Sequence, residues 1–217
     1  MKTAPQRPAR NDLGVVRALR VSYPDDRALL SALAEGHPAA AAAFWDRFAP
    51  LVRGLLRQSL GPRAEIDDLT QDVFLTLFRR AREIRDNLRS FVVGVCIRVA
   101  RGELRRQRIR RWLHLSSDDA LPEVPVREAD HVSRDGLMRL YAILDRLDAD
   151  ARLAFVLRHT QGLEGSEIAA ALGCSLATAK RRLAKAQERL LVHARNDPAL
   201  MHLLDDTLHP DAEAGDP

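Results

Sequence analysis

The chain has 217 residues, and its 34 Lys and Arg against 30 Asp and Glu give a formal net charge of +4. This length suggests one or two domains, each able to bury an ordinary core. Hydrophobic residues make up 46% of the chain but aromatic residues only 5%. Together with the abundance of Ala, Leu and Arg, this composition predicts an all-α protein.

Cysteine and histidine usage argues against a metal protein. Cys96 and Cys174 form no C-x-x-C pair, and the seven histidines are scattered, so we expect two buried thiols, no metal and no cofactor. The chain shows no apolar run of membrane-spanning length and no signal peptide. We therefore expect a cytoplasmic protein.

Helical periodicity divides the chain into two blocks. Residues 1–25 contain several Pro and Gly residues and are expected to form a flexible basic arm. Residues 26–115 form the first predicted domain, with a short helix capped by Asp26 and a longer one that Pro38 opens and Gly61 ends. Two more helices are expected there, from about Ala64 to Arg82 and from about Leu88 to Leu113.

A change of composition then predicts a domain boundary. Residues 116–134 lack periodicity and contain Ser, Asp and Pro, which favours a flexible linker. The second predicted domain spans 135–195, with helices from Asp135 to Leu147 and from Asp150 to about His159. Residues 196–217 contain six Asp or Glu and no Lys or Arg. This acidic tail is expected to be solvated, although it could also fold back on the basic helix before it.

The most informative motif is the segment Glu164–Leu191. A short apolar stripe, Gly173 at a helix end and Ser175 as a cap of the next helix predict a helix-turn-helix. Leu176, Ala179, Leu183, Ala186 and Leu190 are the expected buried stripe of its second helix. The residues expected to contact DNA are Ser175, Thr178, Lys180, Arg181, Arg182 and Lys185. The alternative is an amphipathic hairpin with a solvated basic face.

A second basic feature lies in the first domain. Between Arg79 and Arg111 there are twelve arginines but only three acidic residues. Four of these arginines (Arg98, Arg101, Arg105 and Arg108) are three or four residues apart and share one helix face. Such a stripe suits the phosphate backbone of a nucleic acid. Phe91, before the stripe, could stack on an unpaired base or could simply belong to the core.

The preceding helix has an acidic face. Asp68, Gln71, Asp72 and Leu75 lie opposite its expected apolar stripe, which is typical of a protein-docking surface. A divalent metal site formed by Asp67, Asp68 and Asp72 is the enzymatic alternative. It is disfavoured because Asp67 and Asp68 point about 100° apart on a helix, whereas metal ligands must converge.

Together these features resemble the sigma-70 family of bacterial transcription initiation factors, in its compact extracytoplasmic-function (ECF) group. The matching segments are Asp67–Phe74, Leu88–Val92 with Leu104–Arg106, and Glu167–Ala169 with Leu172–Ser175 and Thr178–Leu183. The resemblance covers roughly residues 26–113 and 137–193. It implies sigma domain 2 followed by sigma domain 4, and no catalytic activity or small-molecule substrate.

The resemblance also implies roles and partners. Asp68, Gln71, Asp72 and Leu75 would dock on the clamp helices of the largest subunit of core RNA polymerase, and domain 4 on the flap region. Phe91 and Arg98–Arg108, including Arg101, Arg105 and Arg106, would open and read the −10 element of promoter DNA. The second helix of the helix-turn-helix would read the −35 element. An anti-sigma factor is a further implied partner.

The chain departs from the family pattern at several positions. Phe91 stands where Trp is usual, Ile97-Arg98 where Arg-Asn is usual, and Gly102 where Asp is usual; Gly102 suggests a bend or a close backbone approach. Asp148 stands in place of a Pro and is expected to cap a helix. Two alternatives therefore stay open: a helix-turn-helix regulator that acts without polymerase docking, and a degenerate sigma-like modulator of transcription.

Overall fold

The computed structural model describes residues 23–62, 64–84, 87–113, 131–195, 197 and 200. All regular elements in these residues are helical, as the composition predicts. The predicted arm, most of the predicted linker and nearly all of the acidic tail lie outside the described residues. No helix in the described parts combines the length and apolar character needed to cross a bilayer.

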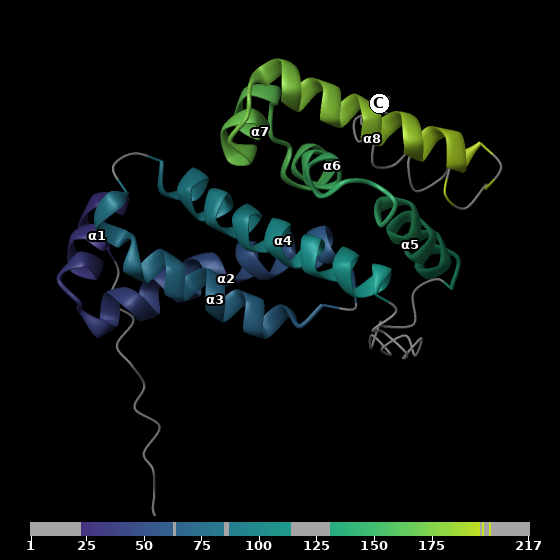
Figure 1. The fold of residues 1–217 in the computed structure, drawn as a ribbon. Helices are drawn as coiled ribbons and strands as arrows, with labels where there is room; N and C mark the ends of the chain where they lie inside the picture. The colour runs from purple at the N-terminus through teal and green to yellow at the C-terminus, as the bar shows by residue number, and fades with distance from the viewer. Residues whose placement is uncertain are drawn as a thin grey trace, which may run out of the picture.

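The first four helices form the lower layer of the molecule (Figure 1). They are α1 (Asp26–Ala34), α2 (Pro38–Leu60), α3 (Ile66–Arg79) and α4 (Leu88–Trp112), with a 3-10 turn, η1 (Ala81–Glu83), between the last two. Pro38 occupies the first turn of α2, and Gly61 ends the helix at φ 81°, as predicted. The cap of α1 is Asp25 rather than Asp26; the Asp25 carboxylate accepts from the Ala28 amide, while Asp26 pairs with Arg47 at 2.6 Å.

The last four helices form the upper layer. They are α5 (His131–Leu144), α6 (Ala149–Gln161), α7 (Gly165–Leu172) and α8 (Leu176–Ala194). The helix α5 begins four residues before the predicted end of the linker and ends three residues before Leu147. Asp148 caps α6 by accepting from the Ala151 amide at 2.8 Å, as predicted.

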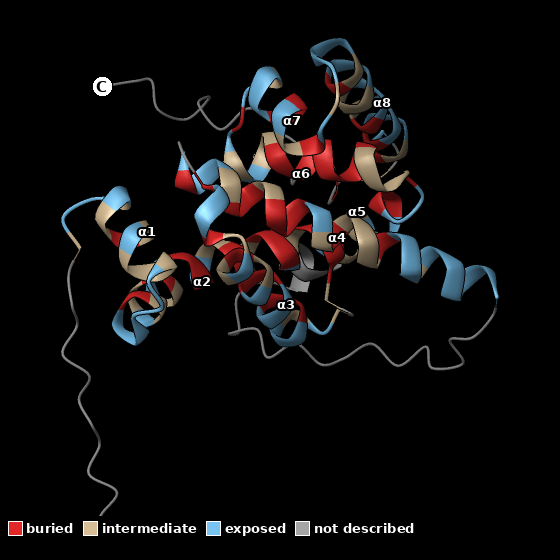
Figure 2. Ribbon diagram, turned by 60° about the vertical axis from the view of Figure 1, so that its left-hand side comes forward, coloured by how far each residue is buried: buried red, intermediate tan, exposed pale blue. Residues whose placement is uncertain are grey.

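The two layers share one hydrophobic core. α6 lies between α4 and α8 (Figure 1) and contacts α2, α4, α7 and α8. Its seven residues from Ala151 to Leu157 are all buried, and Figure 2 shows this segment as the most continuously buried stretch of the upper layer. Leu153 and Leu157 belong to the same cluster as Val52 and Ala100. The order of the helices along the chain does not indicate this packing.

Polar contacts reinforce the layer interface at the C-terminal end of α2. The last carbonyls of a helix have no partner within the helix and attract positive charge. Here the Arg152 Nε donates to the Ser59 carbonyl at 2.5 Å, and the Tyr141 hydroxyl donates to the Arg57 carbonyl at 3.1 Å. The second layer therefore caps a helix of the first.

Candidate functional site

The acidic face predicted on α3 is open to solvent. Asp68, Gln71, Asp72 and Leu75 are all exposed, and 51% of Leu75 is accessible. The opposite face of α3 packs into the core through Leu69, Val73, Phe74 and Leu77. The structure therefore places all four predicted docking residues together on one free surface, with an apolar side chain among polar ones.

The same face does not form a metal site. Asp67 pairs with Arg53 at 3.4 Å instead of converging with Asp68 and Asp72. Within the described residues, no group of three or more His, Cys, Asp or Glu side chains is arranged to hold a metal ion.

The helix-turn-helix has the predicted local geometry. Gly173 adopts a left-handed conformation at φ 64° and ends α7. The Ser175 hydroxyl accepts from the Thr178 amide at 3.2 Å and so caps α8. Glu164 and Glu167 add a capping box at the start of α7. One prediction is wrong: Leu176 is 45% exposed, because as the first residue of α8 it lies beside Gly165 rather than in the core.

The basic residues of α8 divide into two groups. Lys180 and Arg181 are exposed, as is Ser175, and Thr178 is partly so. Arg182 and Lys185 are instead paired with aspartates at the start of α6. Arg182 Nη2 lies 2.8 Å from Asp150 Oδ2, and Lys185 Nζ lies 2.7 Å from Asp148 Oδ2. Only the first turn and a half of the helix presents free basic side chains.

The arginine stripe of α4 faces the second layer rather than open solvent. Arg101 Nε donates to Asp150 Oδ1 at 2.6 Å, and its Nη2 donates to the Leu172 carbonyl at 2.9 Å. Arg101 is therefore the predicted −10 residue most fully engaged within the protein. Burial and the nearby guanidinium groups of Arg80 and Arg101 lower the pKa of Arg98, which is exposed beside the stripe.

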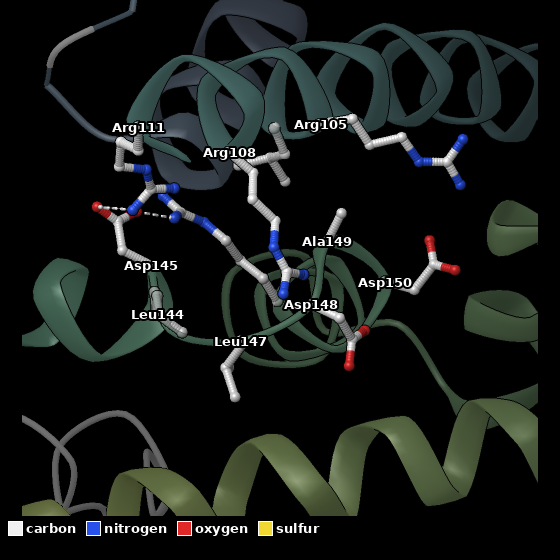
Figure 3. A pocket seen from close by; sticks show the side chains of 11 residues that line it. Arg105, Arg108, Arg111, Leu144, Asp145, Leu147, Asp148, Ala149 and Asp150 are labelled. Atoms are coloured by element: carbon white, nitrogen blue, oxygen red, sulfur yellow. Dashed lines mark hydrogen bonds and ion pairs between the residues drawn. The ribbon is translucent and has the colours of Figure 1, made fainter. Parts of the chain in front are cut away.

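Farther along α4, the stripe lines a small polar cavity of about 180 Å³. Arg105, Arg108 and Arg111 project from α4 on one side, and Asp145, Asp148 and Asp150 lie on the other (Figure 3). Arg111 reaches Asp145 at 3.3 Å. Arg106, on the outer face, pairs with Glu103 at 2.8 Å. Burial raises the pKa of Glu103, but hydrogen bonds from Arg106 and Arg110 hold the pKa below its ordinary value.

Phe91 lies in a second, larger groove. This groove has a volume of about 640 Å³ and is lined by η1 and α4 on one side and by α7 on the other. Phe91 is half-buried against the core, and the Arg80 guanidinium lies over its ring at 5.3 Å. Both predicted roles of Phe91 are therefore compatible with its position, because one edge packs while another faces the groove.

Two other expectations for α4 are wrong. The Cβ of a residue at Gly102 would meet no atom within 4 Å, so no close backbone approach explains this glycine. Leu113, expected on the apolar face, is 47% exposed, and the neighbouring Trp112 is 78% exposed. The end of α4 projects beyond the bundle (Figure 2), and no second-layer helix covers it.

The sequence did not identify the acidic residues that meet the stripe. Asp145 and Asp150 lie at the α5–α6 junction, 40 or more residues from Arg101. Arg152 was also missed: it is 2% exposed, and it bonds to Ser59 and to the Asp145 carboxylate. The only available signal was the concentration of Asp residues around Leu147, directly after the basic block.

Comparison with known proteins identifies both halves of the chain. The model of sigma-70 region 2 matches residues 44–110, and that of sigma-70 region 4 matches residues 137–190. The ferric citrate uptake sigma factor FecI of Escherichia coli is 32% identical over 145 residues, which cover 65% of this chain and 83% of FecI. The ECF sigma factor SigE of Mycolicibacterium smegmatis is 31% identical over 169 residues, covering 70% of this chain and 62% of SigE.

Solved structures show the same fold. CnrH, in complex with the cytosolic domain of CnrY, superposes with a TM-score of 0.57 at 21% identity, covering 79% of this chain and 98% of CnrH. The sigma factor RpoE of Bartonella quintana, in complex with the anti-sigma factor NepR, gives 0.54 at 23% identity, covering 71% and 98%. With two matched regions in the family's order, the chain belongs to the sigma-70 family, in its ECF group of RNA polymerase sigma factors.

Proposed function

We propose that this sigma factor docks on the clamp helices of the largest subunit of core RNA polymerase through the exposed face of α3. The support is the exposure of Asp68, Gln71, Asp72 and Leu75 on a helix whose other face is buried. Charged residues around a central apolar side chain are typical of a specific, transient interface. Domain 4 would contact the flap region, and an anti-sigma factor would compete for these surfaces.

Promoter recognition is assigned to two helices. α4, with Phe91 and the arginines at 98, 101, 105, 106 and 108, would open and read the −10 element. α8, beginning with Ser175, Thr178, Lys180 and Arg181, would read the −35 element in the major groove. Arginine contacts to phosphate would position the protein, and a few side chains at base edges would supply sequence choice.

This function requires the two layers to separate. Elements centred about 25 base pairs apart lie roughly 85 Å apart along B-DNA, at about 3.4 Å per base pair. In the structure, Arg101 of α4 and Arg182 of α8 contact the same carboxylate. The arrangement described here therefore cannot engage both elements at once, and residues 114–130 would have to span the open form. The domain limits 26–115 and 135–195 remain predictions.

The observation that carries the proposal is the exposed α3 face, because a helix-turn-helix regulator acting alone has no use for it. The test mixes the purified chain with core polymerase and promoter-length DNA and measures complex formation and run-off transcripts. A stable complex that initiates transcription is expected. Failure to bind core polymerase would overturn the proposal, and a complex that leaves the DNA closed would favour the degenerate, modulating alternative.

A further inference from the structure

The aspartates at the start of α6 connect the two surfaces that we assign to DNA. Asp150 uses one oxygen for Arg101 of α4 and the other for Arg182 of α8. Asp148 adds Lys185 of α8. Three of the predicted DNA contacts, from both domains, are thus neutralised by two residues of one helical turn.

The partial burial of these pairs makes them stronger than ordinary surface pairs. The side chains of Arg101 and Asp150 are 20% and 19% exposed, and that of Arg182 is 27% exposed. Ion pairs that are shielded from water are screened less by salt than exposed ones. Without the Asp150 charge, Arg101 and Arg182 would lie close together with no counterion, and their repulsion would favour separation of the layers.

A carboxylate bridging two arginines has the same chemistry as a DNA phosphate bridging them, because both offer anionic oxygens to guanidinium groups. The remainder of the stripe repeats the arrangement less tightly, since Arg105 and Arg108 line a cavity with Asp145, Asp148 and Asp150 on its other side (Figure 3). The upper layer therefore presents an acidic surface to the residues that would otherwise contact the phosphate backbone.

We propose that Asp150, supported by Asp148, is an internal competitor of DNA that holds the free protein closed and masks both of its DNA-reading surfaces. This inference rests on the proposed function and adds a regulatory step to it. DNA phosphates, once polymerase holds the domains apart, replace the carboxylates on Arg101, Arg182 and Lys185. The free chain consequently binds DNA more weakly than its basic residues would allow.

The experiment compares the affinity of the free protein for a labelled mixed-sequence DNA duplex at low salt, by fluorescence anisotropy. Asp150→Asn removes the shared charge without changing the shape of the side chain. Apparent affinity falls in proportion to the fraction of open protein, so we expect this variant to bind about tenfold more tightly than wild type. Asp150→Glu, which keeps the charge, should stay close to wild type.

The matched control is Asp46→Asn, an exposed aspartate on α2 that takes part in none of these pairs. It changes the net charge equally, so it measures the general electrostatic gain, expected to be below about twofold. Equal gains in Asp150→Asn and Asp46→Asn would overturn the proposal. So would a gain in Asp150→Glu as large as that in Asp150→Asn.

Small-angle X-ray scattering of the wild-type chain supplies a measurement that needs no variant. The radius of gyration should increase when saturating duplex-bound protein is matched for DNA contrast, and an unchanged value would overturn the proposal. Run-off transcription by the wild-type chain with core polymerase separates the two ideas. If it initiates normally while Asp150→Asn binds DNA no more tightly, only the internal competition fails; if it never binds core polymerase, the proposed function fails.

Discussion

Replacement of Leu75 by Ala should weaken binding to core polymerase without destabilising the fold. Burying a whole Leu side chain is worth about 1.5–3 kcal/mol. Because 51% of Leu75 is already accessible in the free chain, roughly half of that value, about 1 kcal/mol, is available for docking. This loss corresponds to about a fivefold higher Kd.

The assay is a titration of fluorescently labelled chain with core polymerase in the absence of DNA. Leu113→Ala is the control, because Leu113 is similarly exposed, at 47%, but lies at the end of α4. Thermal unfolding should be nearly unchanged in both variants, since exposed side chains contribute little to stability. Equal Kd values for Leu75→Ala and wild type, or an equal loss in Leu113→Ala, would refute the assignment of the α3 face.

Three further predictions concern stability, measured by urea unfolding. Gly173→Ala should cost about 1 kcal/mol because its φ of 64° is unfavourable for a residue with a Cβ, whereas Gly102→Ala, in helical backbone with open space around it, should gain about 1 kcal/mol; a gain in both would contradict the turn geometry. Arg152→Ala should cost about 3 kcal/mol through lost packing and an unpaired Ser59 carbonyl, and Arg152→Met should recover most of this loss if packing outweighs the buried charge. Burial raises the pKa of Asp148, but the hydrogen bonds from Lys185 and the Ala151 amide outweigh it and hold the pKa below 3.8, so its contribution is complete above about pH 5 and is lost as the pH falls through the lowered pKa; Asp148→Asn, which still caps α6, should therefore lose less stability on acidification than wild type.

The local features of the fold were predictable because they depend on neighbouring residues. Pro38, Gly61, Gly173 and Ser175 each act within one turn of the helix that they begin or end. Boundaries were less accurate where two neighbours suit the same role, as with Asp25 and Asp26 at the start of α1.

The packing of the two layers was not predictable in the same way. Helical spacing places Arg98, Arg101, Arg105 and Arg108 on one face, but it does not say which helix covers that face. The covering residues, Asp148 and Asp150, lie beyond a linker and pair with Arg101 and Arg182 only in the folded chain. The sequence therefore indicated where DNA would bind but not what occupies those arginines in its absence.

The roles of α4 and α8 are tested most directly by sequencing the 5′ ends of transcripts made by core polymerase on pooled promoter fragments, with and without this chain. The start sites that depend on the chain should share two sequence blocks, at about 10 and about 35 base pairs upstream, that match the two helices assigned to DNA. Alanine at Lys180 and Arg181 should relax the upstream block alone. If the same start sites are used without the chain, or if dependent sites share no upstream sequence, the assignment of this sigma factor to promoter recognition is contradicted.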